Sequence, residues 1–201
     1  MAKQAYVYSG TDWVPLASEV TNLSGYYTKG EIDIIDAPTG LKLISTTNFS
    51  AVTSVSLPAE TFSSTYTNYR LILNVTSDSV DLPIEIRFRT AGTDNSTNNY
   101  YMRGIESIYG SNVNLANDGT YSTLFSINAA TNAMLVADVI SPQATARTAF
   151  IGNGVGVRTD ANNSAWYVTS WFNATTSFDS MTFLGGGNNF SGSIFVYGYK
   201  K

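Results

Sequence analysis

The feature that most constrains the fold is an apolar period of two, which begins near Leu41 and runs to the end of the chain. Ile84, Ile86 and Phe88, for example, alternate with charged residues. Successive side chains of a β-strand point to opposite faces, so this alternation predicts strands with one buried and one solvated face. Apolar residues three or four apart, which are typical of an amphipathic helix, are almost absent from residues 40–201.

Several stretches carry this strand pattern, and turn-forming residues separate them. The clearest strand candidates are residues 69–75, 84–89, 133–140, 166–172, 181–184 and 194–199. Segment 133–140 is more evenly apolar, so we expect it to be buried on both faces. About ten strands at a spacing of roughly 10–15 residues, with no helices between them, predict an antiparallel β-sandwich with a jelly-roll-like arrangement. This all-β domain spans residues 40–201.

The composition excludes several kinds of partner. Of 201 residues, 43% are hydrophobic, which is enough for a sizeable core, and only 13% are charged. The 11 basic residues form no cluster that could neutralise phosphates, and the net charge is −4, so we expect no nucleic-acid partner. No apolar run approaches the ~18 residues of a membrane span, and no secretory leader is recognisable, so we expect no membrane insertion.

Catalytic chemistry has few candidate residues. The chain contains no His and no Cys, which excludes zinc fingers, disulfides, thiol nucleophiles and Ser-His-Asp triads. Carboxylates in turn-rich segments, such as Asp78, Asp81 and Asp94, are the remaining acid and base candidates. A glycosidase needs two carboxyls about 5–10 Å apart across a cleft, and turn formation is the simpler role for Asp in such segments. We therefore expect a non-enzyme without cofactor or metal.

Two glycine runs are the other motifs to consider. Residues 152–156 and 185–187 match neither the G-x-G-x-x-G pattern nor a P-loop, and no helical pattern follows them. We expect strand bulges or a close approach of neighbouring backbone at these glycines.

The N-terminal residues 1–17 form a segment of their own. Two short aromatic runs flank the turn-rich sequence Ser9-Gly10-Thr11-Asp12, which predicts a small hairpin. Two strands alone are marginally stable in water, so this hairpin should pack on something else. It either folds back on its own domain or docks through aromatic side chains into a partner, and we favour the partner. The candidate anchor residues are Tyr6, Tyr8 and Trp13.

Residues 18–39 form a joint that contains the only helical periodicity in the chain. A capping-box pair, Thr28 and Glu31, predicts a short helix here. The joint also completes an a/d-type seam that covers less than two heptads, so the seam could assist a trimer but not hold one alone. The seam residues are Leu16, Val20, Leu23 and Tyr27.

Aromatic residues beside polar loops are candidates for contact with a receptor. Aromatic side chains supply contact area with little conformational entropy to lose, so they bind sugars and proteins well. The alternative is that each of them lines the sandwich core or a trimer seam. The candidates are Tyr100, Tyr101, Tyr109, Trp166 and Trp171.

Parts of the sequence resemble proteins of tailed-bacteriophage virions. The segment YYTKGEID, residues 26–33, is similar to the YTK-x-E-I-D segment between the attachment region and the distal domain of phage fibres. The chain from Gly40, with the runs FSSTYTNYR at 62–70 and VYGY at 196–199, resembles β-rich C-terminal domains of phage fibre proteins. The aromatic N-terminus AYVYSGTDWV resembles a virion-attachment leader. The resemblance implies a homotrimeric virion component with a jelly-roll-like distal domain and no shared active-site motif.

Together these features predict a non-enzymatic phage structural protein, a short trimeric fibre or spike-like appendage that displays its sandwich to a host surface. Its partners would be other virion proteins, further copies of itself, and a glycan or protein on the host. Its location would be the virion, after assembly in the host cytoplasm. Many phage fibres carry a long shaft and this chain has none, so a capsid decoration or cement protein is an alternative. A carbohydrate-binding, lectin-like domain is a further alternative.

Overall fold

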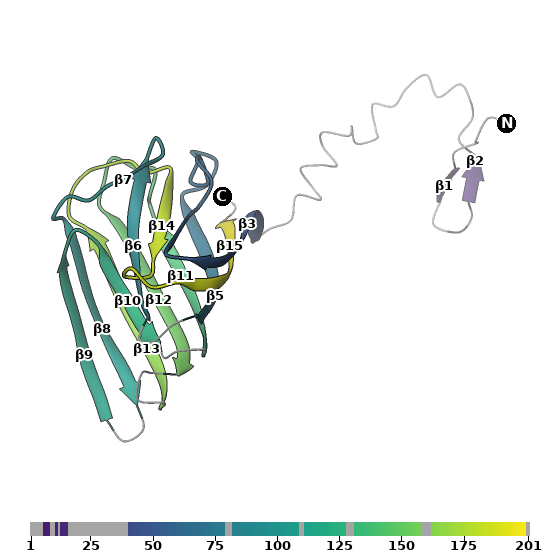
Figure 1. Cartoon of the computed structure of the whole chain (residues 1–201). Helices are drawn as coiled ribbons and strands as arrows, with labels where there is room; N and C mark the ends of the chain where they lie inside the picture. Colours follow the sequence, from purple (N-terminus) through teal and green to yellow (C-terminus); the bar gives the residue numbers. More distant parts are fainter. Residues whose placement is uncertain are drawn as a thin grey trace. The chain divides into compact units, whose positions relative to one another are not determined.

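The computed structural model describes residues 6–8, 11, 13–15, 40–78, 82–108, 111–127, 131–157 and 162–199. The chain divides into two compact units, Met1–Pro38 and Thr39–Lys201 (Figure 1). No helix, and so no helical membrane span, occurs within the described ranges.

The first unit contains a two-stranded antiparallel hairpin. Strand β1 (Tyr6–Tyr8) pairs with β2 (Trp13–Pro15), and Tyr8 lies opposite Trp13. The predicted N-terminal hairpin is therefore confirmed. The predicted helical joint over residues 18–39 lies outside the described residues, and so do the seam candidates Leu16, Val20, Leu23 and Tyr27.

The second unit consists of β-strands joined by turns and loops. In chain order, the strands are β3 (Leu41–Val52), β4 (Ser54–Ser56), β5 (Asn68–Ser77), β6 (Leu82–Thr90), β7 (Thr93–Asp94), β8 (Tyr100–Ile108), β9 (Ser111–Gly119), β10 (Ser122–Ile127), β11 (Asn132–Ile140), β12 (Thr148–Val157), β13 (Asn163–Phe172), β14 (Ser180–Leu184) and β15 (Phe190–Tyr199).

These strands form two antiparallel sheets (Figure 1). The large sheet has eight strands in the order β3-β15-β5-β11-β12-β13-β8-β9. The small sheet has the order β10-β6-β14-β4, and β7 also pairs with β6. Every strand pair is antiparallel, and the sheets have a sandwich-like arrangement, so the predicted all-β fold class is confirmed.

The hydrophobic core follows from the alternation along the strands. Every second residue of β5 and β6 is buried, for example Leu71 and Ile84. Aromatic rings extend this core: Phe178 stacks on Phe88 at 4.9 Å between ring centroids and meets Phe172 edge-on at 5.0 Å. Full burial of one such side chain contributes roughly 1.5–3 kcal/mol, so this apolar cluster supplies much of the driving force for folding.

One strand departs from its sequence-based prediction. The segment 133–140 was expected to be buried on both faces, but β11 alternates between buried and exposed residues. Leu135 and Val139 are buried, whereas Met134 and Val136 are exposed. The expectation of burial on both faces is wrong, because the small sheet covers only one face of the large sheet and no described residue covers the apolar residues on the other.

The two glycine runs have different structural roles. Residues 152–156 lie inside β12, whose pairing with β11 and β13 shows no register shift, so the predicted bulge is absent there. The predicted close approach is confirmed, since an added Cβ at Gly156 would lie 2.8 Å from the Cβ of Ala133. Gly186 and Gly187 have φ angles of +57° and +90° and form the turn between β14 and β15.

Candidate functional site

The outer faces of the two sheets differ in chemistry. On the small sheet, Glu85, Arg87 and Arg89 of β6 alternate with buried apolar residues and make the outer face polar. This is the pattern expected for an antiparallel sheet with one solvated face. The large sheet departs from it, because large apolar side chains are exposed on the outward side of its central strands.

We call the outward side chains of β5, β11, β12, β13 and β8 the open face. A row of register partners crosses it from Ile105 on β8 through Tyr167 and Asn153 to Val136 on β11. Tyr167 is 59% exposed. The exposed apolar residues of this region form the apolar patch, which consists of Ile105, Met134, Val136, Ile151, Val155 and Tyr167. An exposed apolar cluster in the middle of a sheet marks an interaction surface.

Strand β12 explains why this patch exists. The alternate glycines of residues 152–156 point inward, where Trp166 and Leu135 occupy the space that side chains would need. An added Cβ at Gly156 would lie only 2.7 Å from Cη2 of Trp166. From Ile151 to Gly156 the side chains of β12 therefore all point outward, and Ile151 and Val155 are each 51% exposed.

The open face is hollowed along β11, β12 and β13. One hollow of about 1130 Å³ lies at the end near Asn132, and another of about 550 Å³ lies beside Ile151. A smaller hollow of about 220 Å³ shares Met134 with the first and Tyr167 with the second. The three hollows are therefore neighbours along the groove-like middle of the open face, and residues of the apolar patch line each of them.

One ion pair borders the groove on β5 and β11. Arg70 donates two hydrogen bonds to Asp138, from Nε to Oδ1 and from Nη2 to Oδ2, each 2.9 Å long. The hydroxyl of Tyr199 donates a third to Oδ1 at 2.6 Å. Partial burial of Asp138 acts to raise its pKa, but the hydrogen bonds from Arg70 and Tyr199 and the charge of Arg70 outweigh this effect and lower the pKa.

A second ion pair borders the groove on β8 and β9. Arg103 pairs with Asp118, with Nη2 donating to Oδ2 at 3.1 Å. Hydrogen bonding from Arg103 holds the pKa of Asp118 below its ordinary value. On the described parts of the open face and β9, the outward charges are those of Arg70, Asp138, Arg103 and Asp118. This surface is therefore electrically neutral, although the whole chain has a net charge of −4.

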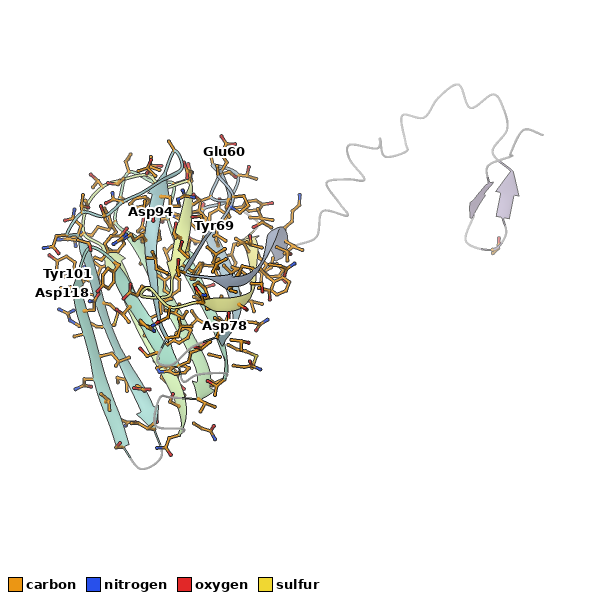
Figure 2. The ribbon with its side chains drawn as sticks, in the orientation of Figure 1. Glu60, Tyr69, Asp78, Asp94, Tyr101 and Asp118 are labelled. Atoms are coloured by element: carbon orange, nitrogen blue, oxygen red, sulfur yellow. The ribbon has the colours of Figure 1, made fainter. Side chains whose placement is uncertain are left out.

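Two of the predicted receptor-contact residues lie side by side at one end of the open face. Tyr101 on β8 and Trp171 on β13 are register partners, and their rings stack at 5.8 Å with 13° between the planes. Both side chains are half-buried. Asp118 is the register partner of Tyr101 on the other side, in β9 (Figure 2). Tyr101 and Trp171 thus remain candidates for an external contact.

Two other predicted receptor-contact residues belong to the core, which corrects that prediction. Tyr100 is fully buried, and its hydroxyl accepts a hydrogen bond from the Phe88 amide at 2.9 Å and donates one to the Asn95 carbonyl at 2.8 Å. Burial raises the pKa of Tyr100. Trp166 is also buried, and its ring stacks on Phe125 at 4.9 Å. Neither side chain can reach a receptor in the folded protein.

The structure does not describe the side chains of the remaining predicted contact and anchor residues. Tyr109 lies outside the described residues. Tyr6, Tyr8 and Trp13 lie on β1 and β2, but their side chains are not among those described. Their role in attachment therefore stays a prediction.

The sequence did not point to the residues of the apolar patch. Tyr167 stands next to Trp166 in the chain, but the two residues face opposite sides of β13. The signal that could have found the patch is the glycine alternation of residues 152–156, which leaves Ile151 and Val155 on the face opposite the glycines.

Two of the carboxylates considered for acid–base chemistry, Asp78 and Asp94, have structural partners, and the third, Asp81, lies outside the described residues. Asp78 accepts hydrogen bonds from the Ser191 hydroxyl, the shorter at 2.9 Å. Asp94 pairs with Arg89 at 2.9 Å and accepts a hydrogen bond from Thr182 at 2.6 Å. The two carboxylates are well separated in Figure 2. In the described part of the chain, no three His, Cys, Asp or Glu side chains gather in a way that could hold a metal ion.

Comparison with known proteins identifies no family. No protein-family model and no curated protein matches the sequence. Among solved structures, the crystal structure of galectin LEC-6 from Caenorhabditis elegans is similar, with 14% sequence identity and a TM-score of 0.34. The match covers 74% of this chain and 94% of the galectin chain. A likeness at this TM-score supports no conclusion about the fold or ligand of this chain.

Proposed function

We propose that the chain is a structural protein of a tailed-phage virion, without enzymatic activity. It is a short trimeric appendage whose N-terminal segment attaches to the particle and whose sandwich is displayed toward the host surface. The observation that carries this proposal is the division of the chain between Pro38 and Thr39. The division separates the leader-like hairpin and the fibre-like segment at 26–33 from the β-rich unit, which is the order found in the phage fibres that the sequence resembles.

The stacked pair of Tyr101 and Trp171 is the proposed host contact. The two rings lie at the end of the open face, beside the exposed ion pair of Arg103 and Asp118. Stacked aromatic rings bordered by a charged pair suit a glycan or a protein receptor, because they combine rigid apolar area with polar groups at the edge. Three such sites in one trimer would strengthen a weak contact by avidity.

Deletion of residues 1–16 from the protein carried on the particle tests the anchoring role. We expect the shortened protein to be absent from purified particles and to remain folded and trimeric in solution. Particles that retain the shortened protein would overturn the anchoring role and favour a capsid decoration or cement protein that binds through the sandwich. Imaging of particles with the protein labelled then shows whether it occupies the tail or the capsid surface.

A further inference from the structure

We propose that the apolar patch in the middle of the open face is the surface through which copies of this chain bind one another. The inference rests on the proposed function in one respect, because it assigns a location to the contact that the trimeric appendage requires. Its starting point is the apolar patch, where Met134 and Tyr167 are more than half exposed in a chain whose other sheet has a polar outer face. Exposed aliphatic groups of this kind gain free energy when a partner removes them from water.

The charges of the open face argue against a charged partner. A nucleic acid, an acidic glycan or a basic peptide requires unpaired charge of opposite sign. Arg70 is already bound to Asp138, and Arg103 is bound to Asp118. A neutral surface has the further property that it can approach an identical surface without repulsion between like charges. A second copy of the chain satisfies this condition even though each copy has a net charge of −4.

Asn153 in the middle of the patch is suited to a partner identical to itself. It is exposed and lies between Tyr167 and Val136 in the row of register partners. Burial of this amide against an apolar surface would leave its N–H and C=O groups without hydrogen bonds, at a cost in free energy. An amide both donates and accepts, so three Asn153 side chains satisfy one another around a threefold axis, each donating to the next copy and accepting from the one before. A single buried Asn fixes the register of coiled-coil dimers in the same way.

The shape and composition of the open face favour a protein surface over a neutral glycan. Five of the six patch residues are aliphatic or Met, and Tyr167 supplies the single aromatic ring. Sugars stack on aromatic rings, whereas aliphatic side chains pack best against other protein side chains. Protruding side chains such as Tyr167 and Met134 stand beside hollows of about 550 and 1130 Å³, so each copy offers both projections and recesses.

Light scattering of the full-length protein at micromolar concentration tests the proposal. We expect the wild type to be oligomeric, and we expect Ile151→Asp and Ile151→Thr to raise its dissociation constant by about 30-fold or more, as at the centre of an interface. The matched control is Ala146→Asp, which places the same charge on an exposed loop outside the open face. Circular dichroism and thermal unfolding of each variant verify that the sandwich is intact.

A cross-linking experiment tests the symmetric contact directly. The chain has no Cys, so Asn153→Cys introduces the only thiol. We expect this variant to form disulfide-linked dimers under oxidising conditions, and we expect Ala146→Cys to form none. Asn153→Cys dimers no more abundant than those of the control would overturn the symmetric contact.

The outcomes also separate this inference from the proposed function. If the Ile151 variants keep the oligomeric mass of the wild type, the inference is overturned and the trimeric appendage stands. If the wild type is a monomer, both the inference and the trimeric part of the proposed function fail. Particle attachment through residues 1–16 is measured independently of either result.

Discussion

Trp166 and Glu106 bind each other inside the sandwich. They are register partners on β13 and β8, and the indole Nε1 donates a hydrogen bond to Oε1 of the carboxylate at 3.0 Å. Both side chains are buried. A buried carboxylate requires such donors, because the surroundings solvate its charge far less than water does.

We expect Trp166→Phe to lower the free energy of unfolding by about 1–3 kcal/mol. The change keeps an aromatic ring against Phe125 but removes a donor from the buried Glu106. Urea unfolding followed by circular dichroism measures the effect. Trp171→Phe is the matched control, since Trp171 is half-buried on the outer face of the same strand and its loss of stability should be much smaller. Equal losses in the two variants would contradict a special role for the buried pair.

The bidentate pair of Arg70 and Asp138 should make stability depend on acidic pH. The pKa of Asp138 in the folded chain is lower than its ordinary value of 3.8, so ionised Asp138 stabilises the folded state above that pH. This contribution is lost as the pH falls from 3.8 through the folded-state pKa. We expect Asp138→Asn to cost about 1 kcal/mol at neutral pH, a small value because the pair is partly exposed. The difference from wild type should shrink in urea titrations at progressively lower pH, and a constant difference would contradict the assignment.

The inward glycines of β12 should tolerate no side chain. We expect Gly156→Ala to destabilise the fold by about 1–3 kcal/mol, because the new Cβ would lie within 2.8 Å of both Trp166 and Ala133. Gly119→Ala is the control, since no atom lies within 4 Å of a Cβ added there. Differential scanning calorimetry of the two variants measures the contrast. A Gly156→Ala protein as stable as wild type would mean that Trp166 moves aside at no cost.

The stacked rings of Tyr101 and Trp171 should matter for adsorption to the host and little for folding. We expect particles carrying Trp171→Ala to adsorb several-fold more slowly, because the alanine removes half of the stacked pair. Adsorption rates of variant and wild-type particles to host cells provide the measurement. Tyr167→Ala, on the open face away from this pair, separates receptor contact from assembly. Unchanged adsorption of folded Trp171→Ala particles would exclude this pair as the contact.

The fold class could be predicted from the sequence because the alternation of apolar and polar residues along a strand is a local property of the sequence. Ile84, Ile86 and Phe88 show their buried face directly, and the strand they predict is the one observed in β6. The sheet order could not be predicted in the same way. It pairs β15 with β3, whose residues are more than 130 positions apart in the chain, and nothing in either strand specifies such a distant partner.

The candidate site was harder to predict because a shift of one residue reverses the face of a strand. Trp166 and Tyr167 are adjacent aromatic residues, and composition alone does not tell which of them is exposed. The tryptophan points into the core toward Glu106, and the tyrosine points out of it. On β11 the same alternation buries Leu135 in the core and exposes its neighbour Met134. Only the pairing of several strands shows that the outward members of these pairs lie together.

In strand β12, adjacent positions are under different structural constraints, because alternate residues face the core and the solvent. Between residues 152 and 156 its inward positions are glycines, and the packing of Trp166 and Leu135 leaves no space there for a side chain. Its outward positions, which include Ile151 and Val155, contribute nothing to the core and are free to change without remodelling it. Related chains could therefore acquire new binding preferences by exchanging only the residues between the glycines, while the sandwich that carries them stays the same.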